Sequence, residues 1–311
     1  MAISTTGGYP QYSGAPSRFI PEIWSSKLLV KWYAACVAAA ISNTDYEGDI
    51  KDVGDKVWIR TRGDVTIRDY TKGSTLVPQY VESPAIEFPI ERAKYFFCSI
   101  DDIDKYQSDV RLLDEWSTDA GYQMKIEIDT EFLADVYSDA DSDNKGATAG
   151  AKSGDINMGA AGSPLAVTKA TVLDLIVDLD TALDEQDVPP EDRWLVAPPW
   201  FRGMIMKSDL KDASLSGDGQ SILRNGRIGR IGYFTIYISN LLTSGTDTYT
   251  VWHCMAGHKR AITFAGQITK TEHLERLENT FGQAIRGLNV FDWKVLKGEG
   301  LCDVYCYKST V

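Results

Sequence analysis

A glycine-punctuated stretch at residues 226–240 constrains the fold of this chain more than any other. Gly226, Gly229 and Gly232 recur at every third position and lead into a run in which apolar and polar side chains alternate. Glycine permits a positive φ or a close backbone approach, and a period of two is typical of a half-buried strand. We therefore predict a tight loop that feeds a β-strand over residues 234–238. A phosphate-binding loop has the reverse order, with its glycines after a strand and before a helix, and this disfavours phosphate binding.

The composition indicates a globular protein with an acidic surface. The chain has 311 residues, of which 43% are hydrophobic and 24% are charged, and a chain of this size buries about 75% of its unfolded surface. Its net charge of −12 argues against a protein that coats DNA, because such proteins carry a cationic footprint. Residues 1–17 lack the basic and apolar regions of a signal peptide, and the most apolar stretch, 28–41, is too short to span a bilayer. An odd number of cysteines, five, favours reduced thiols in a cytosolic compartment.

Changes in composition and in hydrophobic period divide the chain into segments. Small polar residues precede Pro21, which opens a stretch typical of a helix, and the period becomes two from Gly48 onward. The predicted segments are an N-terminal arm (1–20), a first helical region (21–47), a long hairpin (48–98), a long helix (99–140), a flexible loop (141–165), an α/β lobe (166–265) and closing strands (266–311).

The hairpin is predicted from three short alternating runs, at residues 57–59, 65–67 and 86–90. Residues 71–84 contain glycine and prolines and are typical of its tip. Charges of both signs interleave along it. A two-stranded ribbon is marginal alone in water, so we expect this hairpin to lie on a partner surface.

The long helix is predicted from a proline-free region between Asp101 and Asp139, where apolar residues recur at steps of three and four. At 1.5 Å per residue this helix is roughly 55 Å long, and Gly121 is a candidate kink. The apolar stripe consists of Ile103, Tyr106, Val110, Leu113, Ala120, Met124, Ile128, Phe132 and Val136.

The α/β lobe carries signals for both helices and strands. Thr168 is a candidate N-cap of a helix with an apolar stripe over residues 172–183. Residues 193–197 are typical of a buried strand, and Pro198-Pro199 of the first turn of a short helix. Further strands are expected over 251–264 and 290–307, with a mixed segment at 271–285.

The order of these parts is similar to that in the major capsid proteins of tailed phages with the Hong Kong 97-type fold. Residues 226–240 resemble the loop and strand late in the family's A-domain, and residues 193–200 resemble its A-domain strand and helix entry. A Gly-Leu-x-Val-aromatic pattern recurs in the family's last P-domain strands, and residues 287–291 read Gly-Leu-Asn-Val-Phe; Phe281-Gly282 and Lys294-Val295 match beside it. The resemblance implies an α+β fold with an N-arm, an extended E-loop hairpin, a spine helix, an A-domain and a P-domain.

The resemblance also implies a function. It implies a shell protein that assembles itself into hexamers and pentamers of an icosahedral capsid around the double-stranded DNA of a tailed phage. Assembly in the host cytoplasm, a portal protein, possible decoration proteins and a separate scaffolding protein are further implications, the last because the arm reaches the first helix within 20 residues. Some members crosslink an E-loop lysine to a neighbouring asparagine; Lys72 stands near the hairpin tip, but a solvated loop lysine is favoured.

No catalytic, cofactor-binding or metal-binding residue is predicted, and we do not expect an enzyme. His253 and Cys254 are adjacent on an expected strand and point to opposite faces, so together with His258 they make a poor metal site. Cys302 and Cys306 share a face, but a structural zinc site usually takes four ligands. No serine lies in a G-x-S-x-G elbow. Paired acids are best explained by solvation; they are Asp101-Asp102, Glu275 and Glu278.

Three other functions stay open. A nanocompartment shell has the same fold but encloses cargo enzymes. An enzyme with an undetected site and a monomeric binding module belong to other classes. Copurifying cargo, turnover of a small molecule, or a monomer at high concentration would favour each of these in turn.

Overall fold

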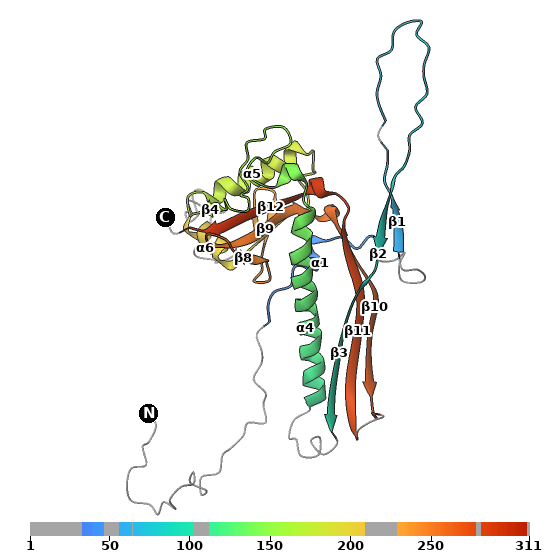
Figure 1. Cartoon of the computed structure of the whole chain (residues 1–311), viewed down its shortest axis with the longest axis vertical. Coiled ribbons are helices and arrows are strands. Elements are labelled where there is room, and N and C mark those ends of the chain that lie inside the picture. Colours follow the sequence, from blue (N-terminus) through green and yellow to red (C-terminus); the bar gives the residue numbers. More distant parts are fainter. Residues whose placement is uncertain are drawn as a thin grey trace, which may run out of the picture.

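The computed structural model places an α/β lobe at one end of a long helix and a long sheet, with a thin hairpin projecting beyond them (Figure 1). It describes residues 33–46, 56–63, 65–101, 112–208, 229–277 and 281–309. Among the described residues no helix is both long and apolar enough to cross a membrane.

The lobe is built on a seven-stranded mixed sheet. Across it run β4 (Leu165–Val167), β12 (Leu301–Lys308), β9 (Thr250–His258), β5 (Arg193–Ala197), β7 (Phe234–Ile238) and β6 (Arg230–Ile231), with β8 (Ser244–Thr246) beside β9. The predicted buried strand is confirmed as β5, which is buried at every residue, parallel to β7 and antiparallel to β9.

Two helices cover one face of this sheet. The stripe predicted for the first, α5 (Val172–Glu185), is buried as expected, but its predicted start at Thr168 is wrong. The Thr168 Oγ1 accepts the N–H groups of Ala170 and Thr171 at 3.3 and 3.2 Å, so this side chain closes a turn ahead of the helix. The second helix, α6 (Pro199–Lys207), starts with proline as predicted, where the missing N–H costs nothing.

The glycine-rich loop feeds a strand as predicted, although Gly226 lies outside the described residues. β6 and β7 form a hairpin in which Ile231 pairs with Phe234. Gly232, in the turn between them, has a φ of 58°, a conformation that side-chain-bearing residues rarely adopt. Phe234 and Ile236 of β7 then point into the core of the lobe.

A second, three-stranded antiparallel sheet extends away from the lobe, in the order β10 (Ile262–Leu274), β11 (Gly282–Val295) and β3 (Arg92–Asp101). The helix α4 (Leu112–Asp135) lies along it (Figure 1). Apolar residues of α4 pack against the lobe and β11 in a shared core that contains Ile128, Phe132, Phe291 and Trp293. Short 3₁₀ turns follow the helix or join strands; they are Val136–Asp139, Ser142–Asn144, Lys259–Ala261 and Gly298–Gly300.

Several predicted boundaries are wrong. The long helix does not start at Asp101, which ends β3, and residues 102–111 lie outside the described part of the chain. The predicted mixed segment 271–285 contains the ends of β10 and β11. The closing strands 266–311 do not stay together, because β12 pairs with β9 and β4 in the lobe.

The hairpin also differs from its prediction. Within the described part of residues 48–98, β1 (Lys56–Arg60) pairs only with β2 (Ala85–Pro89), and residues from Arg92 onward belong to β3. Val65 and Ile67 are not in a strand and are 66% and 89% exposed. An alternating sequence describes the faces of an extended chain but not its hydrogen-bonding partner, so it did not separate these segments.

The first helical region and the predicted flexible loop need correction as well. Within residues 33–46 the only helix is α1 (Ala38–Ile41), and residues 21–32 lie outside the described part. Residues 145–164 contain no helix or strand, yet buried side chains such as Met158 hold them on the lobe. Gly159 allows this packing: its φ is 78°, and a Cβ there would lie 2.1 Å from the carbonyl oxygen of Tyr305.

Candidate assembly surfaces

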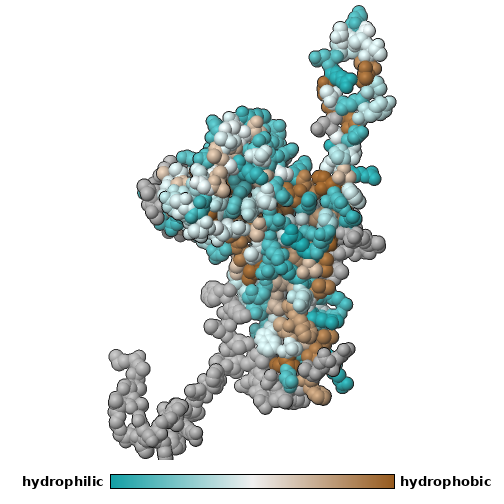
Figure 2. All heavy atoms as spheres, viewed as in Figure 1, coloured by the Kyte–Doolittle hydropathy of each residue, from teal (hydrophilic) through white to brown (hydrophobic). Residues whose placement is uncertain are grey.

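The hairpin beyond β1 and β2 offers an apolar surface to solvent. Thr61 and Pro84 close the paired stem, with a 2.8 Å hydrogen bond from the Thr61 N–H to the Pro84 carbonyl. Beyond them the hairpin projects away from the rest of the chain (Figure 1), and hydrophobic residues stand among hydrophilic ones along it (Figure 2). The exposed apolar residues are Val65, Ile67, Tyr70, Leu76, Val77, Tyr80 and Val81. Exposed apolar residues gathered in this way are typical of a contact surface.

Among the described residues of the hairpin, those at its base pack on their own chain. Ile59 of β1 and Phe88 of β2 are buried in a small core with Ile90 and with Ala265 of β10. Burial of an isoleucine or phenylalanine side chain stabilises a protein by roughly 1.5–3 kcal/mol. The base is therefore part of the folded subunit, whereas the outer part depends on other contacts.

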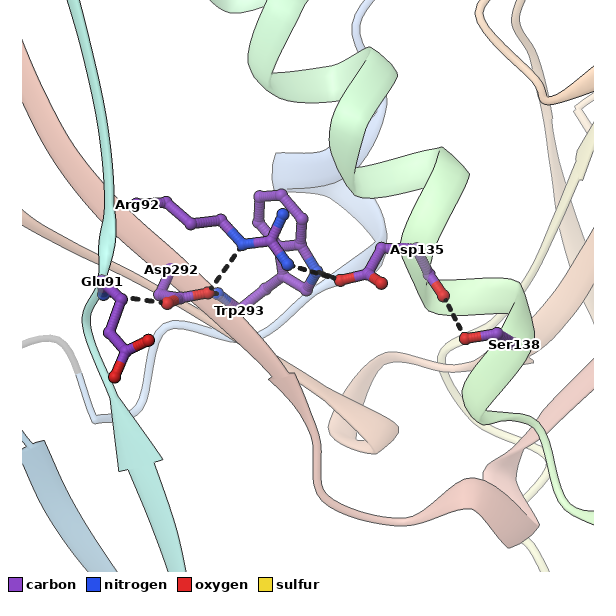
Figure 3. A network of polar contacts seen from close by, with 6 residues as sticks. All are labelled: Glu91, Arg92, Asp135, Ser138, Asp292 and Trp293. Carbon is purple, nitrogen blue, oxygen red and sulfur yellow. Dashed lines mark hydrogen bonds and ion pairs between the residues drawn. The ribbon is translucent and has the colours of Figure 1, made fainter.

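A polar junction joins the hairpin base to the long helix (Figure 3). The Arg92 guanidinium donates to Asp292 of β11 at 3.2 Å and to Asp135 of α4 at 2.7 Å. The Trp293 indole N–H donates to the same Asp135 carboxylate at 3.0 Å, and the guanidinium lies 3.9 Å from the centre of the indole ring. The Asp292 carboxylate also accepts the Glu91 N–H at 3.0 Å. Because these groups share partners, the network holds the hairpin base against α4 more rigidly than a single surface ion pair would.

The N-terminal segment is held along the same helix. The buried Asp129 carboxylate accepts the Val37 and Ala38 N–H groups at 2.7 and 2.9 Å and thereby caps α1. Further along, the Tyr33 hydroxyl donates to Asp119 at 2.8 Å. From Ala38 to Tyr33 the chain thus follows α4 toward the start of that helix. Burial raises the pKa of Asp129, and the two backbone hydrogen bonds oppose this shift.

Asp129→Ala is expected to lower the free energy of unfolding by about 1–3 kcal/mol, because two buried N–H groups lose their acceptor. Asp129→Asn keeps one acceptor oxygen and is expected to cost less. Burial raises the pKa of Asp129 in the folded state. The contribution of this group to the free energy of unfolding is therefore full at pH values below its ordinary pKa, and it decreases as the pH rises through the raised pKa. Urea unfolding of both variants across pH 3–7 checks this, and equal losses for Ala and Asn would contradict the capping role.

One face of the long sheet is a second apolar surface. On the face turned away from α4, Tyr95 and Phe97 of β3 are 79% and 51% exposed, beside the exposed Leu288 of β11. They line a hollow of about 360 Å³. Arg286 and Lys270 both donate to Glu272 at its rim, and these hydrogen bonds, with that from Lys270 the largest, lower the pKa of the Glu272 carboxyl.

The predicted opposition of His253 and Cys254 is confirmed. The His253 Nδ1 lies 2.9 Å from Asp303, and its ring stacks on Tyr137, whereas Cys254 points into the other core. Burial raises the pKa of Asp303, and the hydrogen bond with His253 opposes the shift. His258 accepts the Arg260 N–H at 3.0 Å. Within the described part of the chain no cluster of three or more histidines, cysteines and acids could hold a metal.

The remaining residues named as candidates from the sequence do not lie together in one site. Cys302 and Cys306 are buried on one face of β12, and burial raises the pKa of the Cys302 thiol. Lys72 lies in an exposed turn at the hairpin tip. Glu278 and Asp102 lie outside the described residues. Asp129 was missed as a capping residue because it contacts residues about 90 positions away; its one local signal is an acid placed directly beside the apolar stripe.

The sequence matches the family model of phage capsid proteins over residues 87–303. The chain belongs to the phage capsid protein family. Membership places it among the structural proteins of the virion capsid. A comparison with curated proteins gives no match.

Solved structures support the same fold. A chain of Mycobacterium phage Che8 is 27% identical, with a TM-score of 0.76 and coverage of 93% of this chain and 98% of that one. The capsid of Cyanophage P-SCSP1u gives 15% identity and a TM-score of 0.70, with 94% of each chain covered. The mature capsid of bacteriophage PhiM1 gives 16% identity and a TM-score of 0.65, covering 94% and 93%. The predicted resemblance to tailed-phage major capsid proteins and the α+β Hong Kong 97-type fold are confirmed.

Proposed function

We propose that this capsid protein assembles into hexamers and pentamers of an icosahedral shell that encloses the double-stranded DNA genome of a tailed phage. One subunit occupies both kinds of ring by small changes of tilt, and closed symmetry leaves no unsatisfied edge. The predicted division into arm, E-loop, spine helix, A-domain and P-domain belongs to this proposal.

The projecting hairpin is the observation that carries the proposal. Its apolar side chains are exposed in a single copy, and the described residues of its outer part form no buried cluster. A neighbouring subunit that covers them buries this surface, in a contact between two different patches of the same chain. Such head-to-tail contacts generate rings when the rotation closes. The exposed Tyr95 and Phe97 on the long sheet offer a further contact surface.

The partners follow from the same proposal. A separate scaffolding protein guides assembly in the host cytoplasm, a portal protein occupies one vertex, and decoration proteins are further candidate partners. The role of Lys72 is that of a solvated loop residue, with no crosslink proposed. The shell needs no cofactor and no sequence-specific contact with DNA.

The inner wall is expected to repel DNA rather than bind it. The net charge is −12, and α4 is rich in acids, although Asp129 is buried and Asp135 and Glu131 are paired with Arg92 and Lys94. A wall of like charge lets a packed polyanion move during filling and release.

We expect no detectable binding of isolated subunits to duplex DNA at about 0.15 M salt, where the Debye length is about 8 Å. Fluorescence anisotropy with a labelled duplex measures this, with a basic DNA-binding protein as the positive control. Micromolar or tighter affinity for the duplex that falls steeply with salt would contradict a shell that encloses DNA without binding it, and would favour a nucleic-acid-binding protein.

A further inference from the structure

Two buried thiols lie in contact in the core of the lobe. The sulfur atoms of Cys254 on β9 and Cys306 on β12 are 3.4 Å apart. Both side chains are almost fully buried, on the face of the sheet that packs against α5 and α6. Neither side chain belongs to the assembly surfaces, so the proposed function does not account for their proximity.

The strand register explains the contact. β9 and β12 are antiparallel neighbours in which Cys254 pairs with Val304. Cys306 lies two residues further along, and it is therefore the diagonal neighbour of Cys254 on the same face. A disulfide needs sulfur atoms about 2.05 Å apart and Cα atoms within about 7 Å of each other. Diagonal neighbours lie about 7–8 Å apart, so closing the bond requires a small approach of the two strands as well as a movement of the two sulfur atoms.

We propose that Cys254 and Cys306 are an oxidation site that forms an intrachain disulfide by exchange with a small-molecule disulfide. The Cys306 thiolate attacks one sulfur of the small disulfide and releases one small thiolate, leaving a mixed disulfide on Cys306. The Cys254 thiolate then attacks the Cys306 sulfur and displaces the second small thiolate. The protein dithiol loses two electrons, the small disulfide gains them, and the two thiol protons end on the two released thiols.

Location within the sheet makes Cys306 the first to react. It lies two residues from the end of β12 at Lys308, where β12 pairs with the three-residue strand β4. Strand ends open more readily than strand centres. Contact with Cys306 and then burial raise the pKa of the Cys254 thiol, so its attack is slow until the strand opens.

The reaction is tested on the full chain in a Cys36→Ala, Cys98→Ala background, which removes the exposed and half-exposed thiols and leaves three. The reduced protein is incubated with 2-hydroxyethyl disulfide, and free thiols are counted after denaturation. We expect a loss of two of the three thiols, and a peptide linking Cys254 to Cys306 in mass spectrometry after digestion. The midpoint of urea unfolding is expected to rise on oxidation and to return with reductant, because the new bond closes a loop of about 50 residues.

Matched single variants give the control. Cys254→Ala in the same background is expected to abolish the linked peptide and the shift of the midpoint. Cys302→Ala truncates an equally buried thiol on the same face of β12 and is expected to leave both unchanged. Retention of all three thiols, or a linked peptide that involves Cys302, would overturn the proposal.

Discussion

Ile128→Pro is expected to abolish the folded subunit, not assembly alone. Ile128 lies in the interior of α4 and is only 8% exposed. Proline there removes a helical hydrogen bond and clashes with the preceding turn, at a cost of about 3 kcal/mol or more. Loss of the buried isoleucine side chain adds about 2–5 kcal/mol. The sum is comparable with the total stability of a domain, about 5–15 kcal/mol.

Circular dichroism and thermal melting of the purified variant measure the effect. Ile128→Val is the matched control, because it keeps the helix and most of the buried surface and is expected to cost about 0.5–1.5 kcal/mol. A proline variant that melts at the wild-type temperature would contradict a continuous α4 as the element that joins the lobe to the long sheet.

Replacing residues 62–83 with Asn-Gly is expected to leave a folded subunit that does not form closed shells. The Thr61–Pro84 hydrogen bond closes the stem at this point, and Asn-Gly suits a two-residue hairpin turn. Ile59 and Phe88 stay in place, so the small core at the base is preserved. The variant loses only the exposed apolar surface assigned to contacts between subunits.

The two outcomes are separated by melting and by particle formation. We expect a melting temperature within about 3 °C of the wild type, since a shift of that size corresponds to about 2 kcal/mol for a chain this long. The variant Ile67→Ser, Tyr80→Ser is the matched control, because it removes apolar side chains and keeps the full length of the hairpin. It is expected to impair assembly. Native-size particles from the truncated variant would contradict the role of the hairpin.

The elements predicted well were those with a local signal. β5 is an uninterrupted apolar run, α6 begins with prolines, and the stripe of α5 has a clear helical period. Each depends on residues within a few positions of one another. Periodicity was therefore sufficient for their type and for the side that is buried.

The elements predicted poorly depend on distant partners. Alternation continues from β2 into β3, yet β2 pairs with β1 and β3 pairs with β11, which is about 190 residues away. β12 follows β11 directly but joins another sheet. The Arg92 junction likewise joins Asp135 to Asp292. No local pattern encodes such pairings, because they are selected by the packing of the whole subunit.

Electron microscopy of the purified full-length chain, in negative stain, tests the central claim most directly. A self-assembling capsid protein is expected to give closed shells of uniform diameter, in which class averages resolve rings of six and of five subunits. A monodisperse monomer at concentrations well above about 10 μM would contradict the account, because contacts with micromolar dissociation constants are populated at such concentrations.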